Sequence, residues 1–186
     1  MENRERVVFL DRDGVINQNP GDYQYVSSLK EFKFIPGSLE GIKKLYDKGF
    51  KLFIASNQSG VAKGLYSSQD LDKINKKIIK ELNKSNAKIS GIYYCTHSPD
   101  QGCDCRKPKT GLLTQAISES GLKPDISFFI GDSFRDMQAA ISFGATPILV
   151  LSGKEKISNR DKWEFQPDYV FDNLLLAAHY LCSHYG

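Results

Sequence analysis

The sequence predicts an α/β fold, a doubly wound parallel sheet with helices on both faces. Short apolar runs alternate along the chain with longer segments of helical periodicity, and turn-forming residues separate them. Polar clusters follow directly on several of the apolar runs. Strand–helix alternation of this kind is typical of parallel sheets. In such sheets ligands bind beyond the carboxyl ends of the strands.

The first half of the chain is predicted to contain two strands and two helices. In order, these are a strand over Arg6–Leu10, a helix over 36–45, a strand over 51–55 and a helix that begins after Ser67. Gly49 is a stop signal for the first helix. Ser67 and Asp70 have the spacing of a capping box, and apolar residues recur behind them at helical spacing. Segment 17–34 has no clear periodicity, and we expect it to cover the site as a short flap after the first strand.

The second half is predicted to continue the alternation. In order, it contains a strand over 92–94, a helix over 110–120, a strand over 128–130, a helix over Phe134–Phe143, strands over 147–151 and 169–171, and a helix over 174–181. Gly121 and Gly144 follow two of these helices, at the position where glycine commonly ends a helix. No internal repeat, low-complexity segment or interdomain linker interrupts the pattern. We therefore expect a single domain over residues 1–186.

The composition is that of an ordinary globular protein. Of the 186 residues, 40% are hydrophobic and 25% are charged, and the net charge is +3. So small a charge, spread along the chain, gives no reason to expect nucleic-acid binding. No apolar stretch reaches the roughly 20 residues of a membrane helix, and the N-terminus lacks the apolar core of a signal peptide. We expect a cytoplasmic monomer that binds neither nucleic acid nor a membrane.

A pair of carboxylates follows the first predicted strand. Asp11 and Asp13 lie two residues apart, and Gly14 permits a sharp backbone turn after them. One carboxylate can ligate Mg²⁺ and attack phosphorus, while the other protonates the leaving oxygen. Taken alone, the segment fits a solvated turn equally well, because Asp-Gly is common in turns.

Further polar residues favour the catalytic interpretation. Ser56 and Asn57 offer a hydroxyl and backbone N–H groups to phosphate oxygens. Asp132 offers a third carboxylate for Mg²⁺, which prefers oxygen ligands. Arg106 and Lys107 supply positive charge for a phosphate that carries about two negative charges. We expect these residues to meet at one edge of the sheet and to form one active site.

In this order the motifs resemble those of the haloacid dehalogenase (HAD) superfamily of phosphatases. They are Asp11-x-Asp13-Gly14, Ser56-Asn57-Gln58, Lys107 and Gly131-Asp132-x-x-x-Asp136. The resemblance extends from about Val7 to Lys154 and is closer to the histidinol-phosphatase-like branch. That branch joins D,D-heptose 1,7-bisphosphate phosphatases and histidinol-phosphate phosphatases. The resemblance implies a HAD-type Rossmannoid sheet.

The resemblance also implies a role for each motif residue. Asp11 would be the nucleophile that forms an aspartyl-phosphate, and Asp13 would be the general acid and base. Ser56 and Lys107 would hold the transferred phosphoryl group, with Asp136 orienting Lys107. The ligands of a catalytic Mg²⁺ would be Asp11, the backbone carbonyl of Asp13, and Asp132.

A second cluster has the composition of a zinc site. It consists of Cys95, His97, Cys103 and Cys105. Three thiolates and an imidazole suit tetrahedral Zn²⁺ and leave no open coordination position, which is typical of a structural site. In a cytoplasmic chain such crowding favours a metal over disulfides. The alternative is four unrelated residues in one loop. The resembling family carries zinc here, which would stiffen the loop that presents Arg106 to the substrate.

The resemblance further implies a phosphorylated sugar as the substrate. Segment 56–64 and Ser152-Gly153-Lys154 are similar to the heptose branch, which removes the 7-phosphate of D-glycero-D-manno-heptose 1,7-bisphosphate. That reaction belongs to ADP- or GDP-heptose synthesis for lipopolysaccharide core or surface sugars. One alternative is a phosphatase for histidinol phosphate or another small phosphoester. Another is a zinc-dependent nucleic-acid-binding module with a decayed catalytic site.

Substrate contacts are expected from residues beside the phosphoryl site. The expected contacts are Asn57, Gln58, Ser59, Arg106 and, in the flap, Tyr23. The planar fork of Arg106 suits sugar hydroxyls or a distal phosphate. The chain departs from the family pattern at Thr110, where proline is common, and at Ser133, where some heptose enzymes have lysine. The second departure concerns the surroundings of the metal and the phosphate.

Overall fold

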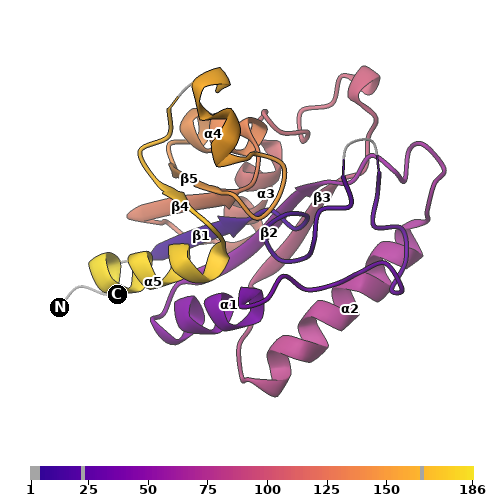
Figure 1. Ribbon diagram of the computed structural model, residues 1–186. Coiled ribbons are helices and arrows are strands. Elements are labelled where there is room, and N and C mark those ends of the chain that lie inside the picture. The colour runs from indigo at the N-terminus through magenta and orange to yellow at the C-terminus, as the bar shows by residue number, and fades with distance from the viewer. Residues whose placement is uncertain (1–4, 22–23, 164–165) are drawn as a thin grey trace.

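The apolar runs of the sequence form a parallel sheet in the computed structural model, which describes residues 5–21, 24–163 and 166–186 (Figure 1). Within these residues the sheet has six strands in the order β3-β2-β1-β4-β5-β6. The strands are β1 (Arg6–Leu10), β2 (Lys51–Asn57), β3 (Gly91–Cys95), β4 (Ile126–Gly131), β5 (Thr146–Val150) and β6 (Val170–Phe171). Each strand pairs with its neighbours in parallel, so all carboxyl ends lie at one edge. The predicted fold class is confirmed.

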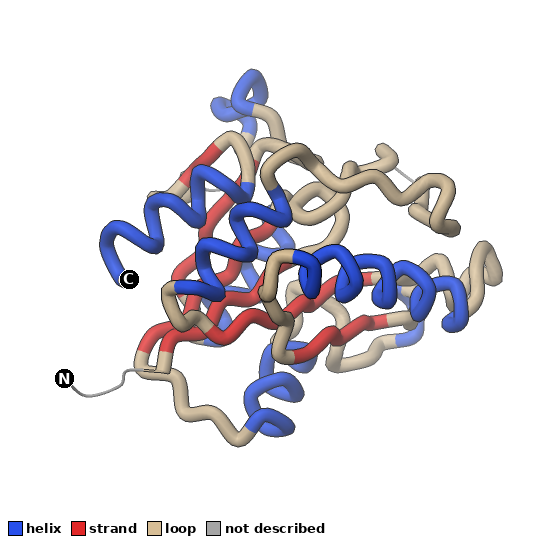
Figure 2. Tube along the Cα trace, turned by 90° about the horizontal axis from the view of Figure 1, so that it is seen from below, coloured by secondary structure: helices blue, strands red, loops and turns tan. Residues whose placement is uncertain are grey.

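Helices cover both faces of the sheet. They are α1 (Ser38–Asp47), α2 (Ser68–Lys84), α3 (Gly111–Ser120), α4 (Phe134–Phe143) and α5 (Leu174–Tyr185), with short 3₁₀ turns at Pro99–Gln101 and Ile157–Lys162. Helices α1, α2 and α5 pack on one face, and α3 and α4 on the other. Figure 2 shows the first group side by side in front of the strands. Among the described helices, none has the length and apolar content needed to cross a membrane.

The apolar run of β1 is explained by its central position. Val8 and Leu10 pack into the core under α1, α2 and α5, whereas Val7 and Phe9 pack into the core under α3 and α4. All four side chains are fully buried. A central parallel strand has no solvent face, so its sequence is continuously apolar rather than alternating.

Several predicted boundaries differ from the observed ones. Strand β2 continues to Asn57, two residues beyond the prediction, because Ser56 and Asn57 still pair with Tyr94 and Cys95 of β3. The predicted cap of α2 is confirmed, since Ser67 and Asp70 exchange the hydrogen bonds of a capping box. Helix α5 extends past 181 to Tyr185.

The flap over 17–34 forms neither helix nor strand in its described residues, 17–21 and 24–34. It is anchored at both ends by an isolated bridge between Asn17 and Phe34. Val26 and Phe32 are buried in the core beside α2. These anchors hold the flap over the edge of the sheet where the strands end.

Candidate active site

The carboxyl ends of β1, β2 and β4 border a cleft of about 360 Å³. It collects most of the predicted site residues: Asp11, Asp13, Ser56, Asn57, Ser59, Arg106, Lys107, Asp132 and Asp136. The flap contributes Asn19, Pro20, Gly21, Gln24 and Tyr25 to the same cleft. A larger depression of about 980 Å³ lies between α3 and α4, but none of the clustered carboxylates lines it. The cleft is therefore the candidate active site.

Lys107 is buried at the centre of the charged groups. Its Nζ lies 3.1 Å from Asp11 Oδ1 and 2.6 Å from Asp136 Oδ1, and it donates a hydrogen bond of 2.8 Å to the Ala55 carbonyl. Burial opposes the charge on Lys107, but Asp11 and Asp136 outweigh it and raise its pKa. The Asn57 amide holds the Lys107 backbone through two hydrogen bonds of 3.1 Å. The lysine is thus a fixed, fully charged cation.

Asp136 is itself held by the start of its helix. Ser133 donates to Asp136 Oδ2 from its backbone N–H at 3.1 Å and from its hydroxyl at 2.7 Å. The departure from the family pattern at Ser133 therefore places a helix cap, rather than a second lysine, beside the site.

Asp132 is packed between two glycines. A Cβ at Gly14 would lie 2.0 Å from Asp132 Oδ2, and a Cβ at Gly153 would lie 1.9 Å from it. The same oxygen accepts hydrogen bonds from the Asn19 amide at 3.0 Å and the Lys154 backbone N–H at 2.7 Å. Burial, and then the negative charge of Asp11 and Asp136, raise the Asp132 pKa well above its ordinary value.

The carboxylates fit a hard divalent cation. Oxygens of Asp11, Asp132 and Asp136 all lie within 4.8 Å of one another. Burial is the largest cause that raises the Asp11 pKa from 3.8 to about 6, against the opposing effect of Lys107. With all three ionised, the carboxylates and the one ammonium would leave two negative charges in a buried place. A Mg²⁺ ion bound by oxygen ligands would balance them.

Asp13 is held by a separate group of donors. Arg12 Nη2 lies 2.9 Å from each of its carboxylate oxygens. The Asn17 and Gln58 amides each donate a further hydrogen bond of 2.8 Å to it. Arg12 is fully buried and stacks over the Tyr94 ring, at 5.7 Å from its centroid. Asp13 thus faces the cleft with its carboxylate in a defined orientation.

The predicted substrate contacts are placed unequally. Asn57, Ser59 and Arg106 line the cleft, and Arg106 Nη1 donates to the His97 carbonyl at 3.3 Å. Gln58 does not line it, because its side chain is 1% exposed and turns inward to Asp13. Tyr23 lies outside the described residues.

Three cations in the cleft were missed by sequence reasoning. Lys63, Arg135 and Lys154 all line it and are exposed. Arg135 lies in the first turn of α4, between two motif aspartates. This position in the motif could have identified it as a site residue. Lys63 donates a hydrogen bond of 2.8 Å to the hydroxyl of Tyr25 in the flap, a pairing that depends on tertiary structure.

The predicted zinc ligands meet beside the cleft. Cys95 Sγ lies 3.6 Å from Cys103 Sγ and 3.8 Å from His97 Nδ1. Cys105 Sγ lies 3.5 Å from Cys103 Sγ and 3.2 Å from His97 Nδ1. The sulfur–sulfur distances are too long for a disulfide. They match the edge of about 3.8 Å expected of a tetrahedron with Zn–S bonds of about 2.3 Å. The four residues therefore fit a closed zinc site.

The chain is similar to proteins of known activity. A family model described as HAD-hydrolase-like matches residues 104–177. The D-glycero-beta-D-manno-heptose-1,7-bisphosphate 7-phosphatase of Pseudomonas aeruginosa is 39% identical over 172 residues, 92% of this chain and 95% of that protein. The D-glycero-alpha-D-manno-heptose-1,7-bisphosphate 7-phosphatase of Campylobacter jejuni is 39% identical over 153 residues, 82% and 86% of the two chains.

A solved structure shares the fold over nearly the whole chain. It is a D,D-heptose 1,7-bisphosphate phosphatase from B. bronchiseptica complexed with magnesium and phosphate. Its sequence is 33% identical, its TM-score is 0.87, and the match covers 96% of this chain and 98% of that one.

Proposed function

The chain belongs to the heptose-1,7-bisphosphate 7-phosphatase family of HAD-like hydrolases, and we propose that it removes the 7-phosphate of D-glycero-D-manno-heptose 1,7-bisphosphate through an aspartyl-phosphate. The observation that carries the proposal is the cleft itself. One aspartate, Asp11, lies against a buried lysine, and a second, Asp13, is held by a separate set of donors. The names of the relatives support the substrate class.

The first step transfers the phosphoryl group to the protein. The Asp11 carboxylate attacks phosphorus, and the bond from phosphorus to the 7-oxygen of the sugar breaks. Asp13, protonated, gives its proton to that oxygen, so the sugar leaves as an alcohol. Lys107 and Ser56 hold the phosphoryl oxygens, where negative charge is concentrated.

The second step regenerates the carboxylate. Asp13, now ionised, takes a proton from a water molecule that attacks the phosphorus of the aspartyl-phosphate. Inorganic phosphate leaves, and Asp11 returns to its ionised form. The two aspartates can divide the work because their partners differ, a lysine for Asp11 and an arginine with two amides for Asp13.

Two metals fit the residues present. Asp11, Asp132 and the backbone carbonyl of Asp13 would hold Mg²⁺, which supplies positive charge that reduces repulsion between carboxylate and phosphate. The cluster of Cys95, His97, Cys103 and Cys105 would hold Zn²⁺ as a structural ion. The second cluster is joined to the cleft, because Arg106 follows Cys105 and contacts the His97 carbonyl.

The experiment that tests the activity also determines which anomer of the substrate the protein prefers. The two relatives described above differ in it, one being named for the beta and one for the alpha form. Purified protein with Mg²⁺ should release phosphate from one anomer of the bisphosphate at a higher kcat/KM than from histidinol phosphate. Phosphorus NMR should show loss of the 7-phosphate, and Asp11→Asn should lack the activity. Retention of substantial turnover by Asp11→Asn, or a preference for histidinol phosphate, would contradict the proposal.

A further inference from the structure

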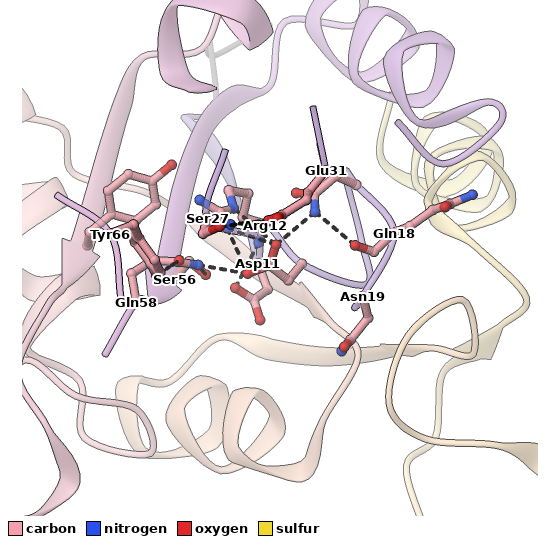
Figure 3. Close-up of polar contacts among 12 residues, drawn as sticks. Asp11, Arg12, Gln18, Asn19, Ser27, Glu31, Ser56, Gln58 and Tyr66 are labelled. Carbon is pink, nitrogen blue, oxygen red and sulfur yellow. Dashed lines mark hydrogen bonds and ion pairs between the residues drawn. The ribbon is translucent and has the colours of Figure 1, made fainter. Parts of the chain in front are cut away.

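A chain of hydrogen bonds leads from Tyr66, in the loop before α2, to Asp13. The Tyr66 hydroxyl donates to Gln58 Oε1 at 2.7 Å. Gln58 Nε2 in turn donates to Asp13 Oδ2 at 2.8 Å and to Ser56 Oγ at 3.1 Å. Figure 3 shows Tyr66, Gln58 and Ser56 gathered beside Asp11. Tyr66 is 8% exposed and Gln58 is 1% exposed, so the bond between them is shielded from water.

Asp13 and Tyr66 together fix the direction of the Gln58 amide. Burial raises the Tyr66 pKa, so the phenol keeps its proton and remains a donor. The ionised Asp13 carboxylate only accepts, so it takes the NH₂ end of the Gln58 amide, and the carbonyl end accepts from the Tyr66 hydroxyl. Turned the other way, Gln58 would present an oxygen to the ionised form of Asp13, and two acceptors would meet without a proton between them.

The position of the Tyr66 ring depends on Gly60. A Cβ at Gly60 would lie 2.1 Å from Tyr66 Cε1, so no larger residue leaves the ring where it is. The Tyr66 ring also packs on Tyr25 of the flap, with 6.1 Å between the ring centroids. The Tyr25 hydroxyl lies 3.4 Å from Ser59 Oγ. The hydrogen-bond chain therefore begins under the flap and ends at the carboxylate that exchanges protons with the substrate.

We propose that Gln58 and Tyr66 are positioning residues for the general acid: Tyr66 orients the Gln58 amide, and Gln58 aims the Asp13 carboxylate at the leaving oxygen. The inference rests on the proposed function, because it gives Asp13 the proton-transfer step. Neither Gln58 nor Tyr66 lines the cleft. Arg12 also holds Asp13, through both carboxylate oxygens. Loss of the bond from Gln58 should therefore change the orientation of the Asp13 carboxylate without releasing it.

A comparison of substrates with different leaving groups distinguishes a positioning role from a purely structural one. A sugar alcohol or a simple alkyl alcohol needs a proton as it leaves, whereas p-nitrophenolate leaves without one. The parameter to compare is kcat/KM, because it reports the steps through loss of the leaving group and not the later hydrolysis of the aspartyl-phosphate. General acid catalysis supplies roughly 10²- to 10⁴-fold, so partial misplacement should cost about tenfold.

The variants are Tyr66→Phe, which removes one hydroxyl, Gln58→Met, which keeps the size, and Gly60→Ala, which displaces the ring. Tyr66→Phe and Gly60→Ala should each lower kcat/KM for heptose 1,7-bisphosphate and for glycerol phosphate about tenfold or more, and for p-nitrophenyl phosphate by less than about threefold. Gln58→Met also removes the bond to Ser56 Oγ, so it should lower all three values, the two alcohol esters about tenfold more than p-nitrophenyl phosphate. Tyr93→Phe is the matched control. Its hydroxyl contacts Glu119 on the far side of β3, and it should leave all three values unchanged.

Each other outcome contradicts the inference. An equal fall for all three substrates would show a structural effect, and no fall would show that Asp13 needs no such support. A fall for the heptose substrate alone would make these residues part of sugar binding. If the wild-type protein hydrolyses none of the three, the proposed function fails instead. If Gln58→Met or Gly60→Ala lowers the yield of folded protein, Tyr66→Phe alone still provides the test.

Discussion

Lys107 and Asp136 form a buried ion pair in which Nζ lies 2.6 Å from Oδ1, with both side chains at most 2% exposed. The pair explains how a lysine stays charged in the interior next to Asp11. It also ties the phosphate-binding loop to the first turn of α4, since Asp136 is held by Ser133. A buried charge that loses its partner is costly, so the pair is open to direct test.

The Asp136→Asn variant should lower both stability and activity. We expect the free energy of unfolding to fall by about 3 kcal/mol, the lower end of the range for a broken buried pair, because Asp11 remains beside Lys107. The kcat/KM for p-nitrophenyl phosphate should fall at least about tenfold, because the ammonium moves away from the phosphoryl group. Urea unfolding and steady-state kinetics measure the two effects.

The control for this prediction is Glu81→Gln on α2. It breaks an exposed pair with Lys84, whose partners lie 2.7 Å apart, and should change neither measurement. A normal kcat/KM in Asp136→Asn would mean that Lys107 does not depend on Asp136 for its position.

The Gly153→Ala variant should weaken Mg²⁺ binding and leave the fold intact. The added methyl group would lie 1.9 Å from Asp132 Oδ2, so the carboxylate must shift from its place in the cluster. The backbone of Gly153 is not in the left-handed region, so alanine introduces no strain of its own. We expect the Mg²⁺ concentration for half-maximal activity to rise about tenfold, which corresponds to about 1.4 kcal/mol. An unchanged Mg²⁺ dependence would separate Asp132 from the cation.

The raised pKa of Asp11 predicts how the metal-free protein responds to pH. Its pKa is about 6 in the folded chain against 3.8 ordinarily, so the folded state binds the proton more tightly than the unfolded state. The fold should therefore lose stability as the pH rises from 3.8 through about 6, by up to about 3 kcal/mol from this group. Mg²⁺ should restore that stability above pH 6 and lose its effect in acid, because protons compete for the same oxygens.

Thermal unfolding across pH, with and without Mg²⁺, measures this effect. Other carboxyl groups also titrate, so the decisive quantity is the difference between the wild type and Asp11→Asn, which lacks the group. The stability of Asp11→Asn relative to the wild type should increase as the pH rises through this range. A difference that is constant across this range would contradict the assignment to Asp11.

Much of the site could be predicted from the sequence because parallel strands bring their ends together. Asp11, Ser56 and Asp132 follow or end three neighbouring strands, so strand prediction alone places them near one another. The zinc ligands are close in sequence, so their spacing alone was sufficient to predict that they lie together. Local signals such as the Ser67 cap were also sufficient.

The direction of individual side chains could not be predicted in this way. Gln58 follows a motif serine and was expected to face the substrate, but Tyr66 and Asp13 hold it inside. Asn57 lines the cleft, yet its amide holds the Lys107 backbone, 50 residues away. Such contacts join segments that are distant in sequence, and neither periodicity nor spacing reports them.

Removal of zinc should reduce activity by loosening Arg106 rather than by unfolding the sheet. The proposed ligands lie at the end of β3 and in the loop before Lys107, and only Cys95 is buried in the core under α3 and α4, with Cys103 and Cys105 packed at its edge. We expect Cys103→Ser to lose zinc in elemental analysis and to keep the far-UV circular dichroism of the sheet. Its kcat/KM for the heptose substrate should fall about tenfold or more. Zinc-free wild-type protein with full activity would contradict the structural role.

Substrate selectivity should depend on Arg106 more than on the phosphoryl site. In the proposed mechanism Ser56, Lys107 and the metal would contact groups that every phosphomonoester has, so discrimination requires a residue that reaches the rest of the substrate. Arg106 lines the cleft, and its bond to the His97 carbonyl limits its motion. Its planar fork suits sugar hydroxyls or a distal phosphate.

We therefore expect Arg106→Ala to lower kcat/KM for heptose 1,7-bisphosphate by about 1–3 kcal/mol, or roughly 5- to 150-fold. The value for p-nitrophenyl phosphate should change by less than about threefold, since that substrate has no distal group to lose. Lys107→Ala should depress both substrates, because Lys107 acts on the phosphoryl group itself. Arg160→Ala is the matched surface control, since Arg160 bonds only to Gln166 among the described side chains and lies outside the cleft. An equal fall of both substrates in Arg106→Ala would place Arg106 in the common chemistry and leave selectivity to Lys63 or Arg135.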